Sequence, residues 1–131
     1  AVIDAILGAA AAGNVGSHFP PSDDAWKNAD SMELLQKAVR ILEARTYQLV
    51  NVDVTVVSET PRIGPWVERM RERLGEVLRV GASAVSVKGK TNEGMGWIGR
   101  GEGLAVHAVA LIDSIGGVDA TWGAADEGLP F

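Results

Sequence analysis

Valine and polar residues alternate in the middle of the chain. The alternating run is Val50, Asn51, Val52, Asp53, Val54, Thr55 and Val56. A period of two places the valines on one face of a strand and the polar side chains on the other. The pattern therefore predicts a β-strand with one buried face and one wet face.

Three other segments have the composition or period of a helix. Ala1–Ala12 consists mainly of small helix-forming residues, and the Gly13–Gly16 segment ends it. A second helix begins near Asp30 or Ser31, and its apolar stripe is Met32, Leu35, Val39 and Leu42. A third helix begins after Pro65, a residue suited to a first turn, and its apolar residues are Trp66, Val67, Met70, Leu74, Val77 and Leu78.

Two further strands complete the predicted fold. Ala84–Lys88 predicts a short strand, and the almost unbroken apolar run Leu104–Ile112 predicts one that is buried on both faces. The order helix, helix, strand, helix, strand, strand predicts an α/β sandwich, in which helices cover one face of a mixed sheet. We expect a second copy of the chain to cover the other face, which makes the protein a homo-oligomer.

Length and composition narrow the class of protein. The 131 residues fit one domain, which we place at residues 1–113, and Ser114–Phe131 has no period and is expected to be a peripheral or disordered tail. The net charge of −5 argues against nucleic acid as a partner. No apolar run approaches the roughly 20 residues that span a bilayer, and the apolar N-terminal segment lacks the basic start of a secretory signal.

The glycine-rich segment Lys88–Gly103 has the densest candidate chemistry. It holds six glycines in sixteen residues, together with the polar side chains Lys90, Thr91, Asn92, Glu93, Arg100 and Glu102. Free N–H groups and fixed cations suit a phosphate, and a carboxylate beside them suits Mg²⁺ bound jointly with substrate phosphates. A glycine-rich hairpin with solvated charges explains the same composition, so both interpretations are open. The segment is not a P-loop, because it lacks the GxxxxGK[ST] pattern.

Several segments together resemble the 2-C-methyl-D-erythritol 2,4-cyclodiphosphate synthase family. The matching segments, in chain order, are Ala1–Ala10, Asn14–Gly16, Phe19–Asp23, Asn51–Thr55, Pro61–Arg62, Lys90–Glu93 and Gly99–Gly103. They are similar to the family's first helix, its Asp-Ile-Gly…Phe-Pro loop, its central strand with the Pro-Lys step, and its Thr-Thr-Glu and Gly-Arg-Gly-Glu-Gly segments. The resemblance runs in unbroken order to about Asp113.

The resemblance implies an activity and an assembly. The family cyclises 4-diphosphocytidyl-2-C-methyl-D-erythritol 2-phosphate and releases CMP, as a lyase of non-mevalonate isoprenoid synthesis. It does so in a homotrimer with active sites between subunits, where a zinc-type ion and Mg²⁺ hold the diphosphate. Such phosphoryl transfer works by positioning and charge neutralisation. The implied location is the bacterial cytoplasm or the plastid stroma, without secretion.

The resemblance also implies residue roles. Thr91 would stabilise the transition state, Asp4 would line the metal side of the pocket as a further catalytic residue, and Glu93 would bind Mg²⁺. The loop implied to bind cytosine is Ser58, Glu59, Thr60, Pro61, Arg62 and Ile63, with Lys90 and Asn92 near the anion. The residues implied to contact the methylerythritol part are Asn14, Val15, Gly16, Phe19, Pro20, Pro21, Ser22 and Asp23. Trp97 and Arg100 match positions that line an axial cavity, where the family can hold an isoprenoid diphosphate or another anion.

The sequence also departs from the family pattern. Three features of the family have no counterpart here: the Asp-x-His near its N-terminus, its His-Ser-Asp segment and the histidine before its first helix. His18 and His107 do not fall at ligand positions. A catalytic zinc normally needs three protein ligands, so the sequence does not support zinc and we expect these 131 residues alone to be inactive. Arg62 replaces the family's usual lysine, and Asn14 and Pro21 replace carboxylates.

Three functional hypotheses are open. The first is a cyclodiphosphate synthase chain that lacks the metal-binding segment. The second is a noncatalytic trimeric module, derived from that family, that binds a cytidine nucleotide or an anion. The third is a rearranged chain in which Ser114–Phe131 replaces the missing N-terminal strands, although this tail lacks Asp-x-His.

Overall fold

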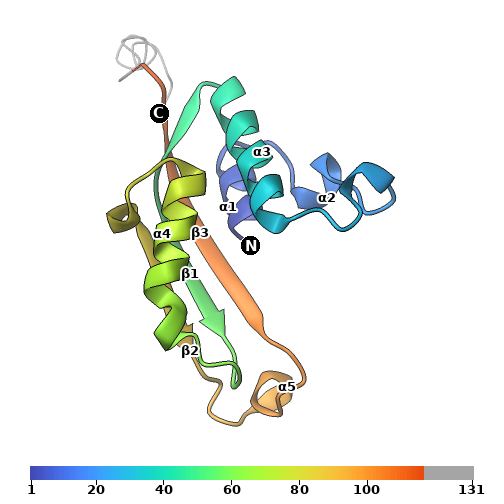
Figure 1. Cartoon of the computed structure of the whole chain (residues 1–131), viewed down its shortest axis with the longest axis vertical. Coiled ribbons are helices and arrows are strands. Elements are labelled where there is room, and N and C mark those ends of the chain that lie inside the picture. Colours follow the sequence, from blue (N-terminus) through green and yellow to red (C-terminus); the bar gives the residue numbers. More distant parts are fainter. Residues whose placement is uncertain (117–131) are drawn as a thin grey trace, which may run out of the picture.

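A mixed sheet forms the frame of the molecule. The computed structural model describes residues 1–116, and the expected C-terminal tail falls almost wholly outside them (Figure 1). The central strand β1 (Tyr47–Val57) pairs in parallel with β2 (Val85–Lys90) and antiparallel with β3 (Ala105–Ser114). The strand order among the described residues is β2-β1-β3. The predicted α/β fold with a mixed sheet is confirmed.

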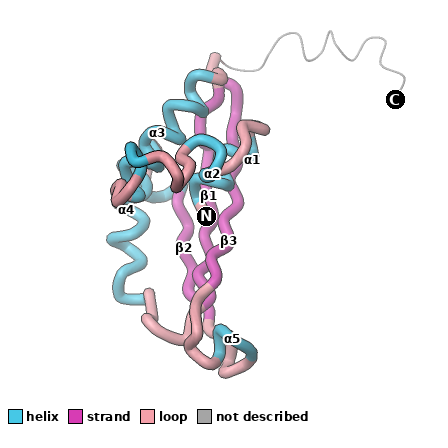
Figure 2. The backbone as a smooth tube through the Cα atoms, turned by 90° about the vertical axis from the view of Figure 1, so that its right-hand side faces the viewer, coloured by secondary structure: helices cyan, strands magenta, loops and turns pink. Residues whose placement is uncertain are grey.

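Three longer helices lie along the sheet on one side (Figure 2). They are α1 (Val2–Ala9), α3 (Ser31–Ala44) and α4 (Val67–Leu78). Of the two residues at which the sequence placed the start of α3, Asp30 is the cap: its carboxylate accepts a hydrogen bond from the Met32 N–H at 2.9 Å. Arg79 ends α4 in a left-handed conformation with a φ of 60°.

The core lies between the helices and the inner face of the sheet. Val52, Val54 and Val56 are only 2–7% exposed, while the residues between them on β1 face the opposite side. The buried residues that join these valines in one cluster include Ile6, Leu7, Leu35, Leu42, Leu74, Leu78 and Val85. The alternation of valine and polar residues therefore produces the one-sided burial that it predicts.

Residues 1–116 leave the outer face of the sheet uncovered. Val109 and Leu111 of β3 are 72% and 55% exposed, whereas Ala108, Ala110 and Ile112 pack partly against the core. Within residues 1–116 of one chain β3 is therefore buried on one face only, and burial of its other face by a second copy stays a prediction. The physical reason is that α1, α3 and α4, the helices that join the core, all pack on the inner face.

Short elements replace some segments that were predicted as loops or as parts of longer helices. The first helix ends at Ala9 rather than Ala12, because Ala11 adopts a positive φ of 52°. The additional elements are α2 (Val15–His18), η1 (Asp24–Trp26), η2 (Gly64–Trp66), η3 (Ala82–Ala84) and α5 (Gly96–Gly99). Within residues 1–116, no helix is long and apolar enough to cross a membrane.

Candidate functional site

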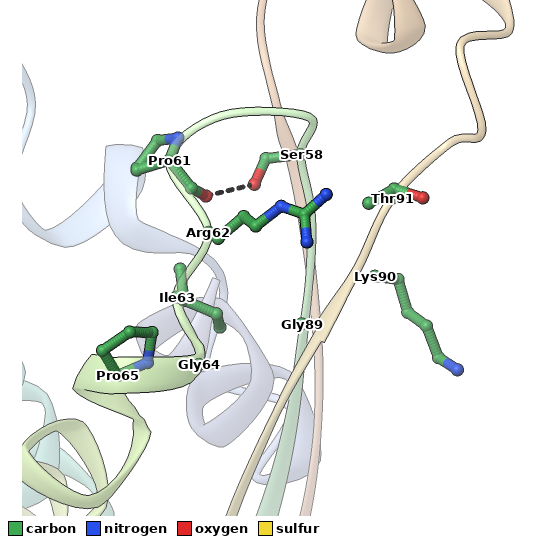
Figure 3. Close-up of a pocket in the computed structure, with 9 residues that line it drawn as sticks. All are labelled: Ser58, Pro61, Arg62, Ile63, Gly64, Pro65, Gly89, Lys90 and Thr91. Atoms are coloured by element: carbon green, nitrogen blue, oxygen red, sulfur yellow. Dashed lines mark hydrogen bonds between the residues drawn. The ribbon is translucent and has the colours of Figure 1, made fainter.

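A cavity opens where the parallel strands β1 and β2 end. It has a volume of about 320 Å³, and its lining residues are Ser58, Pro61, Arg62, Ile63, Gly64, Pro65, Gly89, Lys90 and Thr91 (Figure 3). In α/β sheets, ligands commonly bind in the crevice beyond the carboxyl ends of the strands. Residues predicted from two separate segments, the cytosine loop and the glycine-rich segment, therefore meet at one concave site.

The loop that forms one wall is tied to the end of β2. Ser58 is buried, its N–H donates to the Lys90 carbonyl at 2.9 Å, and its hydroxyl donates to the Pro61 carbonyl at 3.1 Å. The Thr60–Pro61 peptide bond is cis. These contacts leave Pro61, Arg62 and Ile63 facing the end of the neighbouring strand.

The floor of the cavity depends on a glycine. A Cβ placed on Gly89 would stand 2.9 Å from Cγ1 of Ile63, so the isoleucine packs directly against the bare backbone of β2. Figure 3 shows the Arg62 side chain reaching across the cavity toward Thr91, while the Lys90 side chain points away from it. The Arg62 guanidinium therefore extends into the cavity, whereas Lys90 lines it without aiming its ammonium group inward.

The turn after β2 carries the proposed magnesium ligand. Glu93 has a left-handed φ of 53°, and its N–H donates to the Thr91 hydroxyl oxygen at 3.3 Å. Glu93 is an exposed residue. The N–H groups of Asn92 and Gly94 donate instead to the carboxylate of Glu59, at 2.8 and 3.3 Å. Sequence reasoning placed Glu59 only in the cytosine loop, because contacts between residues so far apart have no local sequence signal.

The donor sets differ in their fit to the two expected metals. Mg²⁺ commonly uses one or two carboxylates and completes its shell with phosphates and water, so Glu93 fits as a single protein ligand. Among residues 1–116, no group of three His, Cys, Asp or Glu side chains could hold a metal ion. Residues 1–116 of one chain therefore do not offer a three-ligand zinc site. His18 has a structural contact instead, because its Nε2 lies 2.5 Å from the Ala12 carbonyl oxygen.

The predicted methylerythritol-binding residues form a second group around α2. Asn14 caps this helix through its side-chain oxygen, which accepts from the Ser17 N–H at 2.9 Å, and Asp4 accepts from the Val15 N–H at 2.8 Å. Phe19 is buried and packs edge-on against Trp26, so its ring belongs to the local packing. The Asp23 carboxylate caps η1.

The residues around α2 and the residues that line the cavity lie apart in the folded chain. Both backbone views place α1 and α2 well away from the end of the sheet that carries the cavity and α5 (Figures 1 and 2). The exposed loop residues Pro21, Ser22 and Asp23 belong with the α2 group. One chain therefore does not bring the predicted cytosine and methylerythritol contacts into one pocket.

The predicted axial residues lie on and just after α5. The Trp97 ring covers Gly103, where an added Cβ would stand 3.0 Å from the ring atom Cζ3. Arg100 pairs with Glu102 at 3.0 Å, and both side chains are more than half exposed. This end of the molecule thus presents an aromatic ring and a neutralised ion pair to its surroundings.

Comparison with known proteins identifies the family. The pattern of the YgbB family matches residues 1–113. A protein of Symbiobacterium thermophilum named 2-C-methyl-D-erythritol 2,4-cyclodiphosphate synthase is 54% identical over 112 residues, which are 86% of this chain and 71% of that protein. The chain belongs to the YgbB family of cyclodiphosphate synthases.

Solved structures of YgbB-family proteins share its fold. The bifunctional IspDF of Campylobacter jejuni superposes with a TM-score of 0.83 at 34% identity, covering 86% of this chain and 31% of that one. IspF of Plasmodium falciparum, solved as a CDP complex, gives a TM-score of 0.77 at 29% identity over 88% of this chain and 69% of that one. The resemblance inferred from sequence motifs is confirmed.

Proposed function

We propose that this chain belongs to an enzyme that cyclises 4-diphosphocytidyl-2-C-methyl-D-erythritol 2-phosphate to 2-C-methyl-D-erythritol 2,4-cyclodiphosphate and releases CMP. The observation that carries the proposal is the cavity at the ends of β1 and β2, lined by the Ser58–Ile63 loop, Arg62 and Thr91. Family membership supports it, because relatives at about half identity carry the name of this activity.

The proposed reaction is a phosphoryl transfer within one substrate molecule. An oxygen of the 2-phosphate attacks the β-phosphorus, and the bond from that phosphorus to the bridging oxygen breaks. CMP leaves with the bridging oxygen and its electron pair, so no external oxidant or reductant is needed. Such reactions depend on positioning and on neutralising phosphate charge, with little covalent work by the protein.

Residues of the cavity have matching roles in this proposal. The loop Ser58–Ile63 binds the cytosine, and Arg62 neutralises the phosphates, where its planar guanidinium can donate two parallel hydrogen bonds. The Thr91 hydroxyl, which is exposed at the rim, donates to phosphate oxygens. Glu93 would hold Mg²⁺, which neutralises diphosphate charge when bound.

We further propose that the working assembly is a homotrimer. The support is the outer face of the sheet, where Val109 and Leu111 are exposed beside the polar face of β1. A second copy would bury these side chains. Separate subunits would then supply the Ser58–Ile63 loop and the residues around α2, which lie apart within one chain.

Calorimetric titration with CMP and CDP tests the nucleotide site. We expect the wild type to bind both and Arg62→Met to weaken CDP binding by about tenfold or more, because a charge-assisted contact to phosphate is lost. Arg73→Met is a matched control, since Arg73 lies on α4 and pairs there with Glu76. Failure of the wild type to bind either nucleotide would contradict the proposal. Binding without CMP release from the diphosphate substrate would favour the noncatalytic binding module.

A further inference from the structure

The side chain of Glu59 connects the two walls of the cavity. Glu59 follows the buried Ser58 in the loop after β1, and the residue is partly buried. Its Oε1 accepts hydrogen bonds from the N–H groups of Asn92 at 2.8 Å and Gly94 at 3.3 Å, residues that are 33 and 35 positions away. One carboxylate oxygen therefore links the proposed cytosine loop to the turn that carries Glu93.

The turn needs such an anchor because of its backbone conformation. Glu93 and Gly94 both have positive φ values, 53° and 76°, and this region is unfavourable for glutamate. The other hydrogen bonds of the turn are local, such as Asn92 Nδ2 to the Met95 carbonyl at 2.7 Å. The bonds to Glu59 come from outside the glycine-rich segment. Such conformations persist where the surrounding structure holds them.

The Glu59 carboxylate also changes what this turn offers a ligand. Backbone N–H groups of a glycine-rich turn are suited to phosphate, but those of Asn92 and Gly94 are already engaged by Glu59. The turn therefore presents the Thr91 hydroxyl and the Glu93 carboxylate to a ligand, rather than a nest of free N–H groups.

We infer that Glu59 is a positioning residue, which holds the Asn92–Gly94 turn so that Thr91 and Glu93 meet the diphosphate end of a ligand whose base lies in the Ser58–Ile63 loop. The inference rests on the proposed function for the identity of that ligand. In this inference the Glu59 carboxylate binds the turn, while the base is bound by other groups of the loop. Its effect reaches the ligand through the turn, so it acts on the diphosphate more strongly than on the nucleoside.

Amide hydrogen exchange measured by NMR tests the anchor without any ligand. In Glu59→Ala, the exchange of the Asn92 and Gly94 amides is expected to become about tenfold faster, because their acceptor is gone. Glu59→Gln retains an oxygen acceptor on a side chain of the same length and should restore most of the protection of these amides from exchange. Glu72→Ala removes a carboxylate from an exposed position on α4 and serves as the control.

Calorimetry with CMP and CDP tests the consequence for binding. Glu59→Ala is expected to weaken CDP binding by about tenfold and CMP binding by less than about twofold, with rescue in Glu59→Gln. A general loss of structure would weaken both nucleotides alike and would not be rescued selectively. A larger loss of affinity for CDP than for CMP therefore separates a positioning role from a merely structural one.

The outcomes distinguish the two proposals. Unchanged exchange at Asn92 and Gly94 in Glu59→Ala, or equal losses of CMP and CDP affinity, would overturn the role of Glu59 while leaving the nucleotide site intact. If the wild type binds neither nucleotide, the proposed function fails. In that case faster exchange in Glu59→Ala would still support the anchor, and unchanged exchange would overturn it.

Discussion

The carboxylate of Asp4, in the first turn of α1, accepts a hydrogen bond from the backbone N–H of Val15 at 2.8 Å. Val15 is the first residue of α2, so its N–H has no partner within that helix. The bond fixes α2 against α1. It also gives Asp4 a structural task in addition to the catalytic role that the family resemblance implies.

Replacement of Asp4 by alanine should therefore loosen α2. We expect Asp4→Ala to lower the free energy of unfolding by about 1 kcal/mol, because an exposed hydrogen bond to a charged acceptor is lost. Asp4→Asn keeps an acceptor and should lose less. Urea denaturation of the three proteins measures the difference. Unchanged stability in Asp4→Ala, together with loss of turnover, would instead favour direct contact with the substrate or metal.

Two of the elements predicted from the sequence, β1 and α3, are long enough to show a clear period. Alternating valines predicted β1, and the apolar stripe from Met32 to Leu42 predicted α3. The helices α2 and α5 have only 4 residues each, too few to establish a period. The exposed face of β3 could not be predicted from its composition, because an apolar side chain does not reveal whether its neighbour belongs to the same chain.

The candidate site was predictable to a similar extent. The motifs located the loop Ser58–Ile63 and Thr91, which line one cavity in the structure. They did not show that Lys90 points away from that cavity, because this direction follows from the alternation of faces along β2 and not from the motif. They also missed the bonds between Glu59 and the Asn92–Gly94 turn, which join segments far apart in sequence.

A side chain at position 99 should destabilise the fold. A Cβ at this position would stand 2.1 Å from the carbonyl carbon of Gly94, so the turn after β2 would have to move. We expect Gly99→Ala to lower the free energy of unfolding by about 1–3 kcal/mol, the usual range for overpacking. Thermal unfolding monitored by circular dichroism measures this change.

Gly8→Ala is the matched control for that substitution. Gly8 lies within α1, and a Cβ there would meet nothing within 4 Å. Alanine should raise stability by about 0.5–1 kcal/mol, because it is the better helix former. Equal effects of the two substitutions would contradict the close approach of Gly99 to Gly94.

The ion pair between Asp53 and Lys88 should make stability depend on pH. Asp53 Oδ2 lies 2.9 Å from Lys88 Nζ on the outer face of the sheet. This contact, followed by the Ser86 hydroxyl, lowers the pKa of Asp53 below its ordinary value of 3.8. A carboxylate with a lowered folded-state pKa stabilises the fold at pH values above its unfolded pKa, and the contribution disappears as the pH falls through the folded pKa.

The difference in stability between the wild type and Asp53→Asn should therefore be constant near neutral pH and shrink below about pH 4. Urea titrations at a series of pH values measure it. Both side chains are about half exposed in the single chain, so added salt should also reduce the difference wherever this face is open to solvent. Lys88→Met should reduce the dependence on pH that Asp53 contributes, because the hydrogen bond from Ser86 still favours the carboxylate. A difference that grows as the pH falls would contradict the assigned direction of the pKa shift.

The exposed face of β3 gives the sharpest test of the assembly. Val109 is 72% exposed in the single chain, and it stands opposite Asp53 on the central strand β1. If three copies pack through this face, Val109→Glu would bury a carboxylate without a partner and should weaken association by about 100-fold or more. Gln36→Glu adds the same charge on the exposed side of α3 and should leave association unchanged.

Light scattering after size-exclusion chromatography measures the outcome directly. The wild type and Gln36→Glu should have three times the 13.7 kDa mass of one chain, and Val109→Glu should shift toward that single mass. Nucleotide binding on the same samples adds a second readout. The cavity at the ends of β1 and β2 is built within one chain, so monomeric Val109→Glu should still bind CMP but should not release CMP from the diphosphate substrate. A monomeric wild type that turns over this substrate would contradict the proposal that separate subunits supply the two halves of the site.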